Sequence, residues 1–283
     1  MRTLLTSLIL TCLLAAFAVA QDSTSDKPTA EKEPIIQDNS FLAEEAYNQN
    51  YGVVQHIQTF QRQWISHDWA YSFTQEWPVD MAPRNQLSYN IPVVHFGGVG
   101  GGIGDVALNY RYQLIGDGDA KYAMAPRVSV FLPTGDSRRG YGAGGTGVQL
   151  EIPFSVVHNH KWTTHWDVGT TLTPSQKNPL GETASTYGVN AAQSFIYAVN
   201  NRFNLMLETV WASTETVIAK DKTTRDNTFL MSPGVRWAYN FKSGMQIVPG
   251  VAFPVGVGPS AGDWGVLLYF SIEHPYRKLK PKK

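Results

Sequence analysis

The feature that most constrains this chain is the strict alternation of apolar and polar side chains over segments of about ten residues. In the segment 105–114 every second residue is apolar, namely Val106, Leu108, Tyr110, Tyr112 and Leu114, and the residues between them are Asp, Ala, Asn, Arg and Gln. Alternate side chains point to opposite faces in a β-strand. The sequence therefore predicts strands that each have one apolar and one polar face.

The same alternation recurs along most of the chain and predicts eleven strands from Asp68 onward. They span residues 68–77, 86–94, 105–114, 124–133, 147–157, 162–173, 186–199, 203–212, 228–240, 245–257 and 264–274. Strands of this length cross a bilayer when they are tilted. Residues 51–62 are the candidate for a twelfth strand, but their alternation is weak, so residues 41–62 could instead form a plug inside a barrel.

The connections between these strands alternate in length. Short connections are expected at 79–84, 116–121, 158–161, 200–202 and 242–244, and mostly longer ones at 96–104, 135–146, 174–185, 213–227 and 258–263. Short periplasmic turns, longer extracellular loops and an even number of strands are typical of outer-membrane barrels. We therefore predict an all-β fold, a transmembrane antiparallel β-barrel of about twelve strands over residues 51–276.

Tryptophans are placed as a membrane protein requires. Trp69, Trp211 and Trp264 lie near the long-loop ends of strands, and Trp77, Trp162 and Trp237 lie near the short-turn ends. Two interfacial aromatic girdles would have this distribution. The alternative is that these residues belong to the core of a soluble sandwich.

Six prolines lie within or near the predicted strands, at positions 92, 126, 153, 233, 249 and 254. Proline lacks the amide hydrogen that a strand ladder needs, and it sits mostly at edges and bulges. Because a closed barrel has no edge, we expect bulges or shifted strand boundaries at these positions.

The N-terminus has the features of a secretory signal peptide over residues 1–20. A basic residue, Arg2, precedes a mostly apolar run, and Ala18-Val19-Ala20 is a cleavage site of small residues. A lipoprotein signal at Cys12, which is the only cysteine, is the alternative. No later segment is apolar for long enough to form a transmembrane helix.

Two polar segments flank the predicted barrel. Residues 21–50 are interpreted as a flexible periplasmic leader, within which residues 41–48 could form one or two helical turns. Residues 277–283 form a basic C-terminal tail. The 23 basic and 23 acidic residues of the chain balance, which argues against binding to nucleic acid.

Three stretches carry a resemblance to a known family. They are Gly102–Leu114, Ala125–Asp136 with its Leu-Pro-Thr-Gly-Asp end, and Gly144–Gly147. Together they resemble the meta-pathway phenol-degradation family of outer-membrane transporters. The resemblance implies passage of aromatic catabolites and supplies no ligand residues, and the basic tail departs from the terminal aromatic residue that usually ends a barrel.

If the apolar faces contact lipid, the polar faces line a lumen. The candidates for this lining are Asp105, Asn109, Arg111, Gln113, Arg127, Gln149, Glu151, His165, Asp167, Glu208, Arg236 and Glu273. These mixed charges could select small solutes that pass through the lumen. They could equally pair with one another and fill the interior, since a twelve-stranded barrel is intermediate between filled and open barrels.

Three functions remain at this point. The first is an outer-membrane channel for small molecules, aromatic or hydrophobic ones among them, and the second is a closed structural or adhesion barrel. The third is a lipid hydrolase, for which His95 at a strand end is the candidate residue. His95 has no evident serine partner, and the sequence contains no Gly-x-Ser-x-Gly motif. His158 and His160 form at most a weak metal site.

We therefore expect no enzyme activity, no cofactor and no metal. The expected partners are outer-membrane lipid, a small-molecule solute and, by implication, the barrel-assembly machinery, while the oligomeric state stays open.

Overall fold

The computed structural model describes residue 36 and residues 39–276, apart from residues 80, 83, 118 and 119. The chain divides into residues 1–33 and a compact unit of residues 34–283, and all described residues belong to the second unit. The predicted signal peptide, residues 21–35 of the leader and the basic tail 277–283 lie outside the described residues.

The described residues form one antiparallel sheet of sixteen strands and two short 3-10 helices. The strands are β1 Val53–Gln63, β2 Trp69–Pro78, β3 Asn85–Phe96, β4 Gly100–Ile103, β5 Val106–Tyr112, β6 Tyr122–Met124, β7 Arg127–Leu132, β8 Gly147–Val157, β9 Trp162–Lys177, β10 Thr183–Asn200, β11 Phe203–Ala219, β12 Lys222–Trp237, β13 Tyr239–Asn240, β14 Gln246–Ala252, β15 Val255–Gly256 and β16 Gly265–Pro275. The 3-10 helices are η1 Ser137–Arg139 and η2 Gly258–Ser260.

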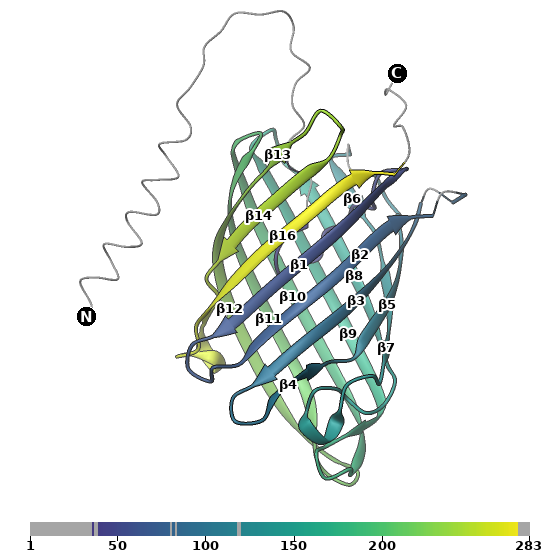
Figure 1. Cartoon of the computed structure of the whole chain (residues 1–283), viewed down its shortest axis with the longest axis vertical. Coiled ribbons are helices and arrows are strands. Elements are labelled where there is room, and N and C mark those ends of the chain that lie inside the picture. The colour runs from purple at the N-terminus through teal and green to yellow at the C-terminus, as the bar shows by residue number, and fades with distance from the viewer. Residues whose placement is uncertain (1–35, 37–38, 80, 83, 118–119, 277–283) are drawn as a thin grey trace, which may run out of the picture. The chain divides into compact units, whose positions relative to one another are not determined.

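The sheet closes into a barrel of twelve strands. Each main strand pairs with its sequence neighbour, β12 pairs with β14, and β16 lies between β14 and β1 (Figure 1). The remaining strands β4, β6, β13 and β15 are short segments paired at the margins. The predicted fold class is confirmed, and of the two alternatives for residues 51–62 the structure has the twelfth strand, β1.

Two predicted long loops, at 174–185 and 213–227, are wrong. Strands β9 to β12 continue through these residues, and only residues 178–182 and 220–221 connect them. Both faces of these extensions are rich in Thr, Ser and charged residues, so they show no apolar alternation, although β-branched Thr favours strands. The hairpins project beyond the rest of the barrel at the lower end of Figure 1.

Two of the six prolines mark interruptions of the wall, as expected, whereas Pro92 and Pro249 lie within the continuous strands β3 and β14. Pro126 separates β6 from β7, and Pro153 lies on the facing strand β8. In the same way Pro254 follows β14 just before β15, and Pro233 lies on the facing strand β12. Two prolines, neither of which has a backbone amide hydrogen, thus face one another on neighbouring strands at two places in the wall.

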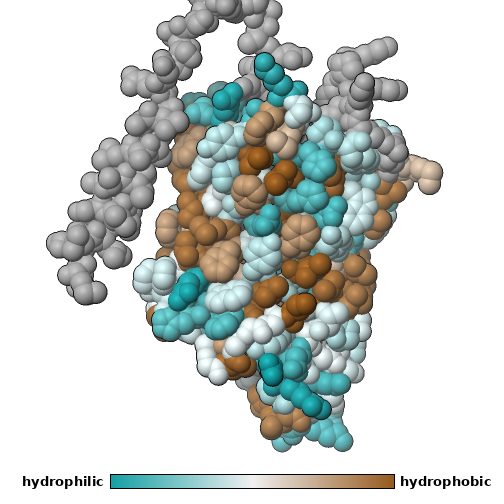
Figure 2. All heavy atoms as spheres, in the orientation of Figure 1, coloured by the Kyte–Doolittle hydropathy of each residue, from teal (hydrophilic) through white to brown (hydrophobic). Residues whose placement is uncertain are grey.

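The outward face of the barrel is apolar and exposed. Leu108 and Val168, on β5 and β9, are 49% and 54% exposed, whereas their sequence neighbours are buried or half-buried. Apolar side chains cover much of the middle of the visible face, with polar residues among them (Figure 2). A closed barrel with such an exterior is suited to a lipid environment. Among the described residues, no helix has the length and apolar character needed to span a bilayer.

Aromatic residues lie at both ends of the strands. Trp162 begins β9 and Trp77 is next to the end of β2, both at the short-turn end. Trp69 begins β2 at the opposite end, and Trp264 directly precedes β16 there. This is the distribution that two interfacial girdles predict.

Candidate functional site

The predicted lining residues lie mostly on the buried face of the barrel wall. The buried ones are Asn109, Arg111, Gln113, Glu151, His165, Asp167, Glu208 and Arg236, and the half-buried ones are Asp105, Arg127, Gln149 and Glu273. Buried polar side chains need partners. These side chains therefore need hydrogen-bonding partners inside the barrel.

Residues 39–50, which we call the luminal segment, lie inside the barrel. Their contacts reach β1 through Gln55, β3 through Gln86, β8 through Ser155 and β10 through Ser194, and so lie on all sides of the wall. The segment contains bends and no helix, so the helical turns expected at 41–48 are not formed. Its backbone groups bond to wall side chains instead of to one another.

Side chains of the wall satisfy the backbone amides of the luminal segment. The Glu208 carboxylate accepts hydrogen bonds from the Leu42 and Ala43 amides at 3.0 and 3.1 Å. The Gln113 side chain accepts one from the Asn48 amide at 2.9 Å and donates one to the Ala46 carbonyl at 2.7 Å. These bonds replace a strand ladder, which explains why so many polar residues are buried here.

A charged cluster holds the middle of the segment. Arg111 and Arg127 are directly opposite one another in the register of β5 and β7, and Glu151 is opposite Arg127 on β8. The Glu44 carboxylate forms ion pairs with both arginines, and Glu151 forms one with Arg127. Arg111 also donates a hydrogen bond to the Tyr47 carbonyl at 2.9 Å.

The Phe41 ring occupies a slot in the wall that glycine makes possible. A Cβ atom on Gly250 would lie 2.7 Å from the Phe41 Cε1 atom, and one on Gly234 would lie 3.0 Å from Cε2. The ring also packs on Tyr269 at a centroid distance of 5.0 Å, within an apolar cluster. The two glycines therefore create a site of the size of an aromatic ring.

One functional pairing was missed from the sequence. The Ser155 hydroxyl lies 2.7 Å from His165 Nδ1 and accepts a hydrogen bond from the Ala46 amide at 2.9 Å. The two residues are ten positions apart on β8 and β9, and their antiparallel register Ser155↔His165 would have suggested the pair. Both are buried beneath the luminal segment, where the pair anchors the Ala46 amide.

Other predicted residues have local roles. Asp105 accepts hydrogen bonds from the Gly135 and Ala143 amides at 2.9 and 2.6 Å, and so holds the 133–146 loop at the long-loop end. His95 stacks on Trp69 at a centroid distance of 5.3 Å, and His158 contacts the Thr164 hydroxyl at 2.9 Å. Within the described part of the chain, no group of three or more metal-ligating side chains is found.

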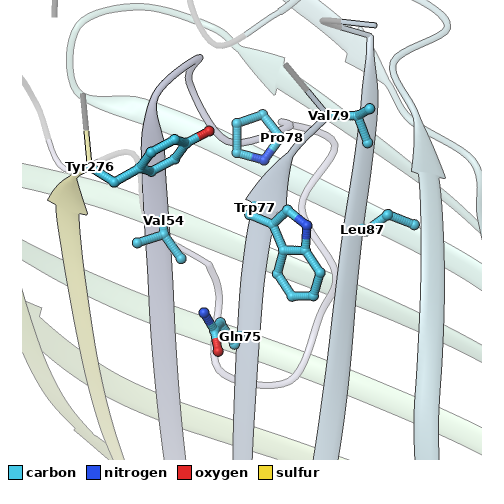
Figure 3. A pocket seen from close by; sticks show the side chains of 7 residues that line it. All are labelled: Val54, Gln75, Trp77, Pro78, Val79, Leu87 and Tyr276. Carbon is cyan, nitrogen blue, oxygen red and sulfur yellow. The ribbon is translucent and has the colours of Figure 1, made fainter. Parts of the chain in front are cut away.

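A small cavity lies beside the luminal segment at the short-turn end. A cavity between Tyr47, His165 and Arg236 measures about 80 Å³, which holds only a few waters. A larger hollow of about 520 Å³ lies at the ends of β1–β3, between Val54, Trp77 and Tyr276 (Figure 3). It is open and lies on the outward face, so it does not belong to the interior.

Comparison with known proteins gives structural neighbours only. No family model matches the chain, and no curated protein matches it. An outer membrane channel from Pseudomonas putida F1 is similar with a TM-score of 0.61 at 14% identity, over 81% of this chain and 97% of that one. The NanC porin is similar with a TM-score of 0.50 at 9% identity, over 77% of this chain and 98% of that one. The chain therefore has the fold of the outer-membrane channel and porin barrels.

Proposed function

We propose that this protein is an outer-membrane channel for small molecules and that the luminal segment closes it in the observed state. The proposal rests on the way in which the interior is filled. A structural barrel fills its interior with the side chains of the wall. Here a separate segment does so, and it can leave without breaking a strand pair of the barrel.

The contacts of the segment support reversible closure. Ser40, Leu42 and Ala46 are each held by a hydrogen bond to a single wall side chain. Water can replace such bonds when the segment moves, and the wall then keeps a polar interior suited to solutes. The barrel is thus complete without the luminal segment, which can move out of the interior.

The solute class that we propose includes small aromatic molecules. The slot formed by Gly234, Gly250 and Tyr269 accepts the ring of Phe41, and a vacated slot would accept another flat ring. This agrees with the resemblance of the 102–147 region to the meta-pathway phenol-degradation family, which we propose as the family of this protein. The slot itself does not depend on that resemblance.

The closed structural barrel is the second candidate, and the filled interior favours it. The two functions differ in whether the luminal segment ever leaves. A disulfide between the segment and the wall separates them, because the Ser40 and Ser194 hydroxyl oxygens are 2.9 Å apart. Cys12 lies in the predicted signal peptide, so the exported chain carries no competing thiol.

The test is the conductance of the Ser40→Cys, Ser194→Cys double variant in planar bilayers. We expect openings under reducing conditions and their loss on oxidation, because a disulfide of about 2 Å keeps the segment in place. Each single cysteine variant is the matched control and should conduct under both conditions. If neither the reduced variant nor a chain without residues 36–50 conducts, the protein is a closed structural barrel.

A further inference from the structure

The wall contains a built-in site for an anion. Arg111 and Arg127 face one another across β5 and β7, and both point into the interior. Directly opposed like charges destabilise a sheet. Their side chains are nevertheless held together because a carboxylate, that of Glu44, forms ion pairs with both.

Glu44 is the carboxylate of this cluster that does not belong to the wall. Glu151 and Asp167 are fixed on β8 and β9, where their register is set by the neighbouring strands. These two wall acids equal the two arginines in number. Glu151 forms an ion pair with Arg127, whereas Glu44 forms ion pairs with both arginines and so bridges them.

The site can be reached from the remaining space of the interior. The Arg111 side chain is 2% exposed, whereas those of Arg127 and Glu44 are each 17% exposed. A small solute can therefore approach the edge of the ion pair formed by Arg127 and Glu44. Arginine is suited to this role, since its planar guanidinium binds a carboxylate in two-pronged fashion.

We propose that Arg111 and Arg127 form a binding site for a solute carboxylate, and that Glu44 occupies this site in the closed channel. The inference rests on the proposed function and names the solute class as small carboxylates. A carboxylate that binds the two arginines competes with Glu44, which belongs to the luminal segment. Solute binding and displacement of the luminal segment are then linked.

The test is isothermal titration calorimetry of the purified full-length mature barrel with sodium benzoate, and with benzamide as the uncharged probe. In Glu44→Gln the internal competitor loses its charge, so we expect benzoate to bind roughly tenfold more tightly than to the unaltered protein. Benzamide should bind both proteins equally. Arg127→Gln should lose benzoate binding, and its gel mobility before and after heating shows whether it is folded.

A matched control is Glu215→Gln. Glu215 also forms an ion pair with an arginine, Arg225, at 2.9 Å, but on the projecting β11–β12 hairpin. This variant should leave benzoate affinity unchanged. Equal benzoate affinity in Glu44→Gln and the unaltered protein, or equal gains for benzoate and benzamide, would overturn the carboxylate site.

The two proposals fail in different ways. If Glu44→Gln gains benzoate affinity but no variant conducts in bilayers, the binding site stands and the channel function fails. If the reduced cysteine variant conducts but Glu44→Gln binds benzoate no better, the channel stands and the carboxylate site fails. When both hold, benzoate should increase the open time of the unaltered channel at concentrations where benzamide does not.

Discussion

At the scale of single residues, this protein is organised by inward polar side chains that serve a segment of the same chain. Glu208, Gln113, Gln86 and Ser155 each accept a hydrogen bond from a backbone amide of residues 39–50. An unpaired buried amide is costly, so each of these side chains stabilises the closed state. The alternation of the strands predicts that Glu208 and Gln113 point inward, but it does not show which groups they bind.

The residue-scale prediction concerns the slot of Phe41. In Gly250→Ala the new methyl group would overlap the Phe41 ring, and overpacking of this kind costs about 1–3 kcal/mol. Because the segment can move away and the wall cannot, we expect a higher conductance in planar bilayers with the barrel intact.

Two variants control for this substitution. Gly188→Ala also adds a methyl group to a buried wall position, where the nearest atom is Thr214 Cγ2 at 3.3 Å and the luminal segment is not in contact, so its conductance should not change. In a Phe41→Ala background, Gly250→Ala should have no further effect. An equal increase in conductance with and without the Phe41 ring would contradict the interpretation that Gly250 makes room for this ring.

At the scale of elements, the strands fall into two groups. Where one face meets lipid and the other the interior, as in β5 and β8, alternation locates the strand to within a few residues. Beyond the apolar belt, both faces of β9 to β12 are polar, so the sequence pattern predicts loops where the strands continue. The luminal segment is non-helical because its amides bond to the wall. Local helix propensity does not predict these contacts.

The element-scale prediction concerns the β11–β12 hairpin. Replacing residues 214–226 by Asn-Gly joins Ser213 to Asn227, which are paired in the register, through a turn type suited to hairpins. We expect the barrel to fold and conduct as before, and its unfolding temperature to fall by less than about 5 °C, since the lost Arg225–Glu215 pair is partly exposed. The measurements are the gel mobility of the unheated protein and a thermal melt. Loss of the folded band would mean that the hairpin is part of the barrel core.

At the scale of the whole molecule, the barrel is closed by its last strand. β16 pairs with β1 over eleven residue pairs, from Val53↔Pro275 to Gln63↔Gly265, and with β14 on its other side. Closure leaves no open edge within the bilayer, where unpaired backbone groups are costly. The membrane fold therefore depends on contacts between the two ends of the described chain.

The whole-molecule prediction follows from this closure. The full barrel should migrate differently on a denaturing gel before and after boiling, because a closed barrel resists the detergent until it is heated. A chain that ends at residue 264 lacks β16, so both β1 and β14 lose a neighbour, and it should give the same band in both lanes. A soluble protein without a heat-dependent shift would contradict the membrane barrel.

The sequence by itself determined the class of fold, eleven of the twelve barrel strands and the inward face of those strands, because a strand with lipid on one side and an interior on the other must alternate. It also placed Arg111 and Arg127 on neighbouring strands. Only the tertiary structure decided that residues 39–50 fill the interior, that Glu44 bridges the two arginines, and that Gly234 and Gly250 hold Phe41. These contacts join residues far apart in the chain through a surface that exists only after the barrel has closed, so no local pattern encodes them.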